Sequence, residues 1–303
     1  MTARTLHAIV NPAAAGGRLK TKWEPVADYI HHQGIAVCPH FTREGREAAA
    51  LAKTLIEAGE RDLAAAGGDG TAFEVINGIL SSGAAGSVRF GILPLGTGNS
   101  FLRDFDIRDW RTAAARIVAG KTRPIDVGRV TWPVDGSRPP LYFHNMLGLG
   151  LMAEACRLRH GRFGFMGRYA YHAAFFNQLM IMKNRPATLC LEGGKEFPVR
   201  VPLLAVCNSQ FTGHDMRLSP HSRVDDGRFD LLYAENISPL EILKLFLQLP
   251  QGTHLRHPKV RVAPFSEGEI EMKEPGYIMM DGEVIEAQRI RVEVLPGALQ
   301  VMV

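Results

Sequence analysis

A glycine-rich segment, residues 67–74, stands between a short apolar run at 63–66 and a helical pattern of apolar residues at 73–80. A buried strand that passes through a loop into a helix is the repeating unit of a parallel α/β sheet. Glycines let a backbone approach polyphosphate oxygens closely, and the helix that follows directs its free N–H groups at the anion. The segment predicts a phosphate loop, and a purely structural glycine turn is the alternative. The loop comprises Gly67, Gly68, Asp69, Gly70, Thr71 and Glu74.

Two features of this loop suggest how it works. Thr71 and Glu74 have the spacing of a capping box, which predicts that the helix begins there. Asp69 puts a carboxylate inside an anion site, which is unfavourable unless a metal ion, a substrate hydroxyl or a cation shares that site. Asp69 therefore points to phosphoryl transfer.

Two further segments repeat the order of strand, loop and helix. Residues 6–10 lead into a loop at 11–18, and residues 88–93 lead into a loop at 94–100. Ligands bind at the carboxyl ends of the strands in an open parallel sheet, so we expect the three loops to converge on one nucleotide.

Polar side chains in these loops are suited to a nucleotide. Asn11 and Thr97 can hydrogen-bond phosphate or ribose, and Arg18 or Lys20 can neutralise phosphate charge. An Asn-Pro turn and a surface helix with solvated cations are the alternatives.

The three loops read NPAAAGG, GGDGT and PLGTGN in this order. Together they resemble the catalytic domain of the diacylglycerol kinase and sphingosine kinase superfamily, in its bacterial lipid kinase branch. The resemblance spans essentially the whole chain, because DDGRFD at 225–230 and MDGE at 280–283 match two later signatures. GGDGT alone is shared with NAD kinases and related phosphofructokinases, so it identifies only the wider fold.

The resemblance implies ATP and Mg²⁺ as cofactors and a lipid as the acceptor. Glu283 corresponds to the position commonly assigned as proton acceptor, with Asp281 and Asp69 as competing candidates or as organisers of Mg²⁺ and water. A glycine between two acids allows a tight bend that projects both carboxylates, and an ordinary Asp-Gly hairpin turn is the alternative. The nucleotide-binding positions are Asn11, Pro12, Ala13, Ala14, Ala15, Thr42, Gly67, Gly68, Asp69, Gly70, Thr71, Glu74, Gly96, Thr97 and Asn99.

The DDG segment resembles a metal-linked turn of the family. By position Asp226 is the carboxylate ligand, and the carbonyl groups of Arg223 and Arg228 complete the set. Some relatives have a second acid where this chain has Arg223, so a metal-free turn is the alternative. Ser100 and Ala72-Phe73 also depart from the family pattern, beside the phosphate loops.

The order of predicted elements divides the chain of 303 residues in two. We expect an α/β N-terminal domain with a parallel sheet, NAD kinase/diacylglycerol kinase-like, at 1–124, with 297–303 returning to it. A C-terminal antiparallel β-sandwich domain, which would hold the lipid substrate, takes 125–296. Expected strands lie near 5–10, 35–41, 62–66, 88–93, 125–130, 141–147, 187–191, 199–207, 229–233, 259–263, 269–272, 277–280 and 289–294, and helices near 18–32, 44–58, 71–81, 98–105 and 110–119.

Two helical segments are expected in the second domain. The segment at 152–182 mixes arginines with aromatic residues, which fits a lipid headgroup boundary or a core helix with a basic end. These residues are Arg157, Arg159, Arg162 and Arg168, with Phe163, Phe165, Tyr169, Tyr171, Phe175 and Phe176. The second helix begins with the capping box of Ser238 and Glu241. Its stripe of Leu240, Leu243, Phe246 and Leu247 fits core packing better than an acyl-chain wall.

The amino-acid composition limits which other classes of protein the chain can belong to. With 46% hydrophobic residues the chain can build cores, and a net charge of +4 is too small to indicate nucleic-acid binding, although it permits approach to an anionic membrane. The four cysteines have no metal-like spacing and are expected to be reduced and mostly buried. No signal peptide is recognisable, and no apolar run approaches the ~20 residues that span a bilayer. We expect a cytoplasmic protein, peripheral at the inner face of the membrane, and leave a homodimer open.

These observations predict a kinase that uses ATP and Mg²⁺ to phosphorylate a diacylglycerol-like or sphingoid alcohol. A soluble-substrate kinase of the NAD kinase type and a nucleotide-binding regulator without turnover are the alternatives.

Overall fold

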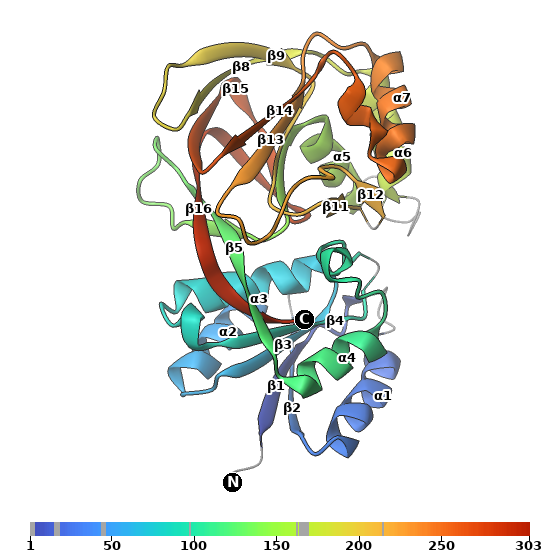
Figure 1. Ribbon diagram of the computed structural model, residues 1–303, viewed down its shortest axis with the longest axis vertical. Helices are drawn as coiled ribbons and strands as arrows, with labels where there is room; N and C mark the ends of the chain where they lie inside the picture. Colours follow the sequence, from blue (N-terminus) through green and yellow to red (C-terminus); the bar gives the residue numbers. More distant parts are fainter. Residues whose placement is uncertain are drawn as a thin grey trace. The chain divides into compact units, whose positions relative to one another are not determined.

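A computed structural model describes residues 4–14, 19–43, 47–96, 98–161, 163, 170–213 and 215–303 of the chain, without the side chains of Lys20 and His160. The chain forms two compact units, Met1–Asp126 with Pro296–Val303, and Val127–Leu295 (Figure 1). Several residues singled out from the sequence lie outside the described part, namely Ala15, Arg18, Thr97, Arg162, Phe165, Arg168 and Tyr169.

The first unit is a parallel sheet covered by helices (Figure 1). Its strands run in the order β16-β4-β3-β1-β2, and each described pair in it is parallel. Strand β3 is buried along its whole length, as expected for a strand with helices on both faces. Helix α1 packs against α4, and α2 against α3. The elements are β1 (Thr5–Val10), α1 (Leu19–His32), β2 (Ala36–Phe41), α2 (Glu47–Glu57), β3 (Asp62–Gly67), α3 (Asp69–Ser81), η2 (Ala85–Ser87), β4 (Arg89–Pro94), η3 (Phe101–Phe105) and α4 (Trp110–Ala119).

A buried carboxylate fixes the amino ends of these strands. Asp62, only 5% exposed, accepts hydrogen bonds from the Nε atoms of Arg4 and Arg89, each at 2.5 Å. The Arg4 guanidinium also donates to the carbonyl oxygen of Ile117 at 2.8 Å. Paired charges of this kind are costly to break singly, so the group holds β1, β3, β4 and α4 in place.

The second unit is built from antiparallel strands in the order β14-β13-β10-β7-β15-β16, with β8 also on β15 and β9 on β8. This confirms the predicted fold class, a parallel α/β part followed by an antiparallel sandwich. The elements are β5 (Thr122–Thr131), β6 (Leu141–Phe143), β7 (Met146–Gly150), α5 (Leu151–His160), α6 (Ala170–Met180), β8 (Arg185–Leu191), β9 (Phe197–Val201), β10 (Leu203–Cys207), β11 (Phe211–Thr212), β12 (Met216–Arg217), β13 (Phe229–Ala234), α7 (Pro239–Gln248), η5 (Leu249–Gln251), η6 (Thr253–Arg256), β14 (Val260–Phe265), β15 (Glu267–Met280) and β16 (Glu283–Met302).

Several strand bounds differ from the sequence-based expectation. The strand expected at 141–147 is interrupted at His144 and Asn145, whose backbone N–H groups bond a side chain instead of a neighbouring strand. Pro202, which lacks an N–H, separates β9 from β10. The strands expected at 269–272 and 277–280 are one strand, β15, with an irregular register between Glu271 and Gly276.

In helix α7 the apolar side chains that pack against the core differ in part from the predicted stripe. The capping box of Ser238 and Glu241 is present as predicted. The predicted stripe residues Leu243 and Phe246 are partly buried against the core, beside the buried Ile242 and Leu245. The other two, Leu240 and Leu247, are 62% and 65% exposed. The spacing of seven residues puts these two leucines on one face of the helix, turned away from the core.

No helix in the described ranges combines the length and the apolarity needed to cross a bilayer. The four cysteines are free, and the prediction that most are buried is half right, because Cys156 and Cys207 are buried while Cys38 and Cys190 are partly exposed.

Candidate active site

The loops after β3 and β4 interlock in the first unit. The carbonyl oxygen of Gly67 accepts hydrogen bonds from the N–H groups of Leu95 at 3.0 Å and Gly96 at 2.8 Å. A Cβ atom on Gly96 would lie 2.5 Å from the Cα atom of Gly68, a separation that real Cβ atoms do not adopt. Glycine at 96 is therefore required by the neighbouring loop, and the two loops form one surface.

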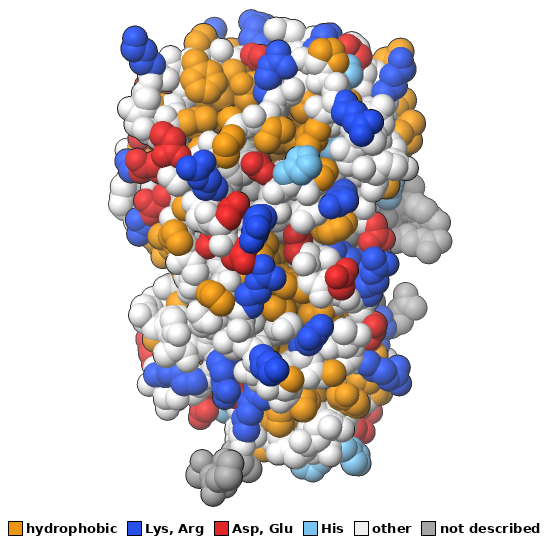
Figure 2. Space-filling model, viewed as in Figure 1, with side chains coloured by type: hydrophobic (Ala, Val, Ile, Leu, Met, Phe, Trp, Pro, Cys, Tyr) orange, Lys and Arg blue, Asp and Glu red, His pale blue; other side chains and the backbone are white. Residues whose placement is uncertain are grey.

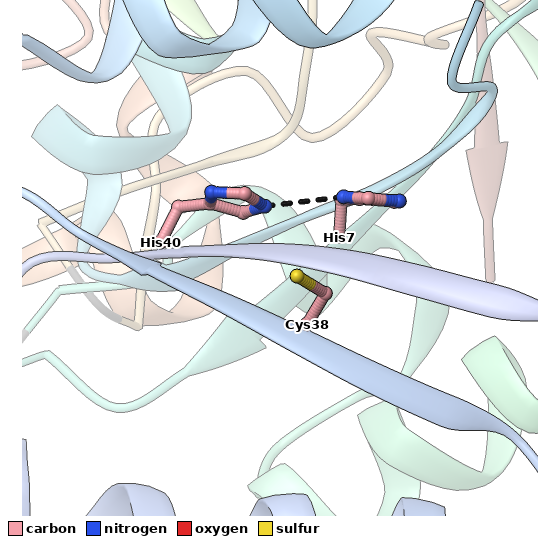
Figure 3. Close-up of side chains that lie close together, drawn as sticks. All are labelled: His7, Cys38 and His40. Carbon is pink, nitrogen blue, oxygen red and sulfur yellow. Dashed lines mark hydrogen bonds between the residues drawn. The ribbon is translucent and has the colours of Figure 1, made fainter.

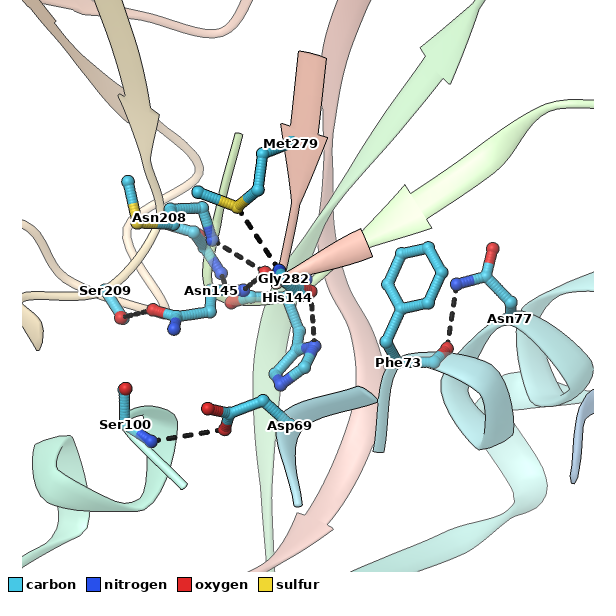
Figure 4. A network of polar contacts seen from close by, with 12 residues as sticks. Asp69, Phe73, Asn77, Ser100, His144, Asn145, Asn208, Ser209, Met279 and Gly282 are labelled. Atoms are coloured by element: carbon cyan, nitrogen blue, oxygen red, sulfur yellow. Dashed lines mark hydrogen bonds and ion pairs between the residues drawn. The ribbon is translucent and has the colours of Figure 1, made fainter. Parts of the chain in front are cut away.

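Asp69 joins the same two loops through its side chain. Its Oδ1 atom accepts hydrogen bonds from the backbone N–H groups of Asn99 at 2.9 Å and Ser100 at 3.2 Å, at the start of η3 (Figure 4). A Cβ atom on Gly98 would lie 2.3 Å from Asp69 Oδ2. The Asp69 carboxylate thus holds the β4 loop, which explains in part how an acid is tolerated in an anion-binding loop.

Helix α3 begins three residues earlier than the predicted capping box allows. Its N-cap is Gly68, which makes no side-chain capping bond, and Thr71 is buried in the first turn. Glu74 accepts a hydrogen bond from the N–H of Ala48 at 3.2 Å, so it caps α2 instead of its own helix. The capping box of Thr71 and Glu74 is therefore wrong.

The start of α3 is suited to an anion. Gly68, Asp69 and Gly70 are partly exposed, and a helix start without a side-chain cap offers backbone N–H donors and the positive end of the helix dipole. Gly67, by contrast, is buried, and a Cβ atom there would lie 2.3 Å from Thr71 Oγ1. Gly67 makes room for Thr71, and the partly exposed Gly68 and Gly70 remain the positions suited to phosphate.

The loop after β1 joins this surface through Asn11. Its Nδ2 atom donates to Thr71 Oγ1 at 3.3 Å, its Oδ1 accepts from the N–H of Ala13 at 3.1 Å, and its backbone N–H donates to Ala66. Pro12 and Ala14 belong to the same turn. Thr42, after β2, donates its backbone N–H to Val10 at 2.9 Å. The structure thus brings together the described nucleotide candidates of all three loops.

Asn99 supplies an unsatisfied acceptor on this surface. The residue has a φ of 77°, its Nδ2 donates to the Gly96 carbonyl at 3.3 Å, and its buried Oδ1 has no hydrogen-bond partner within the described ranges. A buried acceptor without a partner is costly, and a ligand that brings a hydroxyl or amino group satisfies it. These observations fit a nucleotide.

In the second unit, the Asp281 carboxylate is almost completely buried and accepts several hydrogen bonds. Oδ2 accepts from the N–H of His144 at 2.8 Å, and Oδ1 accepts from the N–H groups of Asn145 at 3.1 Å and Met146 at 2.8 Å. The His144 Nδ1 atom lies 2.7 Å from Oδ2. Asp281 therefore anchors the loop between β6 and β7, a positioning role that differs from the predicted role as an alternative base.

The Asp281-Gly282 turn is a hairpin turn with a positive φ at both positions, 50° and 99°. This is the geometry of a type I′ turn, the ordinary connection between two antiparallel strands. The predicted bend is present, but the two acids that flank Gly282 do not share an environment. Asp281 is buried, whereas Glu283, the first residue of β16, is partly exposed.

Cys156 lies beside this turn and donates its thiol to the Gly282 carbonyl at 3.0 Å. Burial raises the pKa of the Cys156 thiol to about 11, and the negative charge of Glu283 raises it further while Arg159 lowers it. The thiol is therefore neutral near pH 7.

A buried polar network, not found from the sequence, supports the turn (Figure 4). Asn208 donates its Nδ2 to the His144 carbonyl at 2.8 Å and its N–H to the Asn145 carbonyl at 3.0 Å. Ser209 donates its hydroxyl to Asn145 Oδ1. The sequence signal was present, because His144-Asn145 and Asn208-Ser209 are polar pairs that directly follow apolar strands.

The predicted metal turn is exposed. Asp226 accepts a hydrogen bond from the N–H of Arg228 at 3.1 Å, as in an ordinary turn. The Nε atom of Arg223 lies 3.5 Å from Asp225 Oδ1 and brings a positive charge to the turn. This cation counts against a divalent ion, so the Mg²⁺ site of Asp226, Arg223 and Arg228 stays a prediction, and we assign no step to a metal there.

Two known domain families match the chain. Residues 5–130 match the diacylglycerol kinase catalytic domain, and residues 147–303, more than half the chain, match the YegS C-terminal NAD kinase beta sandwich-like domain. The chain belongs to the diacylglycerol kinase-like family. This kinase family accounts for both units and for the loops of the first.

Relatives of this kinase span nearly its whole length. It is 25% identical over 302 residues to a diacylglycerol kinase of Mycobacterium tuberculosis, covering 97% of this chain and 94% of that protein. It is 28% identical over 282 residues to a diacylglycerol kinase of Bacillus subtilis, covering 91% and 88%.

Solved structures share the fold of this kinase. A putative diacylglycerol kinase from Bacillus anthracis has a TM-score of 0.80 at 21% identity and covers 100% of this chain and 96% of that chain. Yeast NADH kinase complexed with NADH has a TM-score of 0.54 at 10% identity and covers 99% and 83%. At these identities the likeness shows the fold alone.

Proposed function

We propose that this kinase transfers the γ-phosphate of ATP to a hydroxyl group of a membrane lipid, a diacylglycerol-like or sphingoid alcohol. The observation that supports ATP binding is the surface formed by three interlocked loops at the uncapped start of α3. The relatives named diacylglycerol kinase support the lipid acceptor.

In this proposal the first unit holds ATP. The N–H groups at the start of α3, around Gly68 and Gly70, would bind phosphate oxygens, and Asn99 Oδ1 would accept a hydrogen bond from a hydroxyl or amino group of the nucleoside. Asn11 and Asp69 hold the three loops in register. Mg²⁺ would arrive bound to the nucleotide phosphates, where it neutralises charge.

Glu283 is the proposed proton acceptor for the lipid hydroxyl. It follows directly after a turn that Asp281 ties into a buried network, so its backbone is held rigidly while its side chain stays partly exposed. Proton transfer to a positioned base contributes about 10²–10⁴-fold to a rate. The Asp281 carboxylate already accepts three backbone N–H groups, and His144 Nδ1 lies 2.7 Å from it, which makes it a poor competitor for this role.

An apolar cavity in the second unit supports a lipid acceptor. It has a volume of about 70 Å³, enough for a segment of a hydrocarbon tail, and it lies between α5, α6, α7 and the sheet. Phe175 and Phe246 stack beside it with ring centroids 4.3 Å apart. The lining includes Met152, Tyr171, Phe175, Leu232, Ile242 and Leu245.

Exposed apolar side chains on the helices around this cavity suggest how a lipid is reached. Met180 and Ile181 at the end of α6 are 83% and 64% exposed, and Leu240 and Leu247 lie on the outer face of α7. Figure 2 shows hydrophobic side chains at the surface among scattered lysine and arginine side chains. Such a surface suits peripheral contact with an anionic membrane.

The test is transfer of labelled γ-phosphate from ATP and Mg²⁺ to a total lipid extract in mixed micelles. A labelled phospholipid should form with the intact chain, and Glu283→Gln should slow its formation about 10²–10⁴-fold. Glu286→Gln, an exposed glutamate on the same strand, is the matched control and should keep the activity. Labelling of NAD in place of lipid, or nucleotide binding without transfer to either, would refute the proposal.

A further inference from the structure

Three side chains that commonly bind metals lie close together on β1 and β2 of the first unit (Figure 3). In the parallel register of β1 and β2, His7 pairs with Cys38, and His40 follows two residues later on the same face. The Nδ1 atom of His7 and the Nε2 atom of His40 are 3.1 Å apart. The ligand atoms of the three residues lie within 4.8 Å of one another.

A carboxylate orients one of the two histidines. The Nε2 atom of His7 lies 3.0 Å from Glu60 Oε2, in the turn before β3. When Nε2–H donates to Glu60, the unprotonated Nδ1 of His7 faces His40 and Cys38. Histidine ligands in metalloproteins typically donate their second ring nitrogen to a carboxylate in this way.

The spacing of these atoms suits a tetrahedral ion. With Zn–N bonds of about 2.0–2.1 Å, two nitrogen ligands of zinc lie roughly 3.3 Å apart, close to the separation of the two imidazole nitrogens. The Cys38 sulfur lies within 4.8 Å of both nitrogens, and binding the same ion would draw it closer. Cys38 and His40 are partly exposed, so water can take a fourth position.

We propose that His7 Nδ1, His40 Nε2 and Cys38 Sγ bind a zinc ion. The Cys38 thiol releases its proton to solvent on binding, and His40 binds as a neutral imidazole with its proton on Nδ1. The ion replaces the hydrogen bond between the two imidazoles and joins the edge strand β2 to β1. A hydrogen-bonded histidine pair beside an uninvolved thiol is the alternative.

Cobalt provides the decisive test, because a thiolate bound to Co²⁺ gives a charge-transfer absorption in the near ultraviolet that imidazole ligands do not give. We expect this band on titration of the reduced, metal-free full-length chain, saturating at one equivalent and removed by Zn²⁺. Cys38→Ser should lose the band. Cys190→Ser, which changes the other partly exposed cysteine, should keep it.

Two further variants separate ligands from neighbours. His40→Gln should weaken Co²⁺ binding at least about tenfold, and Glu60→Gln, which removes only the partner of His7, should weaken it about tenfold. Thermal unfolding without metal identifies any variant that fails to fold. The Co²⁺ affinities of the variants that do fold then decide whether the site exists. Absence of the band in the unmodified chain, or its persistence in Cys38→Ser, would overturn the proposal.

Discussion

The His144 imidazole lies 2.7 Å from the Asp281 carboxylate, and both side chains are almost fully buried although 137 residues separate them in the chain. This contact fixes the backbone immediately before Glu283. The rigidity of the proposed base therefore depends on a residue that does not itself need to exchange a proton.

Replacement of the Asp281 carboxylate should lower mainly the stability of the folded protein. Asp281→Asn puts an amide where a carboxylate accepts close donors, and leaves buried N–H groups without a full set of acceptors. We expect a loss of about 3 kcal/mol in the free energy of unfolding, measured in urea. An unfolding midpoint equal to that of the unmodified chain would contradict the anchoring role.

Glu283→Gln should show the opposite pattern. The side chain is partly exposed and its backbone position is unchanged, so the free energy of unfolding should stay within about 0.5 kcal/mol. The turnover number should fall about 10²–10⁴-fold while nucleotide affinity is retained. Loss of stability together with activity would instead make Glu283 a structural residue.

Gly96→Ala tests the interlocked loops. The new Cβ atom would lie 2.5 Å from Gly68 Cα and would force the two loops apart. Overpacking of this kind costs about 1–3 kcal/mol, so nucleotide binding should weaken about tenfold in calorimetry. Gly86→Ala is the control, since a Cβ atom there meets nothing within 4 Å, and its nucleotide affinity should be unchanged.

The cap of α7 predicts a pH dependence. Hydrogen bonds from Ser238, and then from Lys259, hold the pKa of Glu241 at about 2, below its ordinary value of 4.5. A lowered folded-state pKa stabilises the protein above the unfolded pKa, and this contribution disappears as the pH falls through the folded pKa. The melting temperature of Glu241→Gln should therefore lie below that of the unmodified chain at pH 7, and the difference should shrink between pH 4.5 and pH 2.

The outer face of α7 is the proposed membrane contact. Leu240→Ser with Leu247→Ser removes two exposed apolar side chains without touching the core residues Ile242 and Leu245. Binding to anionic vesicles should weaken at least about tenfold, and activity on a short-chain lipid in micelles should be retained. Val134→Ser, 79% exposed elsewhere on the same unit, should bind vesicles normally.

Local patterns predicted much of the first unit. The apolar runs and glycine loops located β1 to β4 and the loops that follow them, because each signal lies within about ten residues of sequence. The start of α3 was misplaced because its N-cap is Gly68, which has no capping side chain, and because Glu74 bonds Ala48, a residue on another helix.

Contacts between segments that are distant in the sequence could not be predicted from local patterns. Asp281 was recognised as an acid after a strand, yet its burial depends on the His144 loop folding over it. The cluster of His7, Cys38 and His40 exists only because β1 and β2 are parallel and in one register. No spacing along the chain encodes that proximity.

Strand β16 has a consequence for synthesis of the chain. The residues that pair with β4, Gln300 and Val301, are made after the whole of the second unit, so the first unit has to wait with one edge of its sheet open. An open strand edge is a template for pairing with other chains. The second unit is continuous in sequence, whereas the first unit is completed only when residues 296–303 join its sheet, so β16 closes the open edge beside β4.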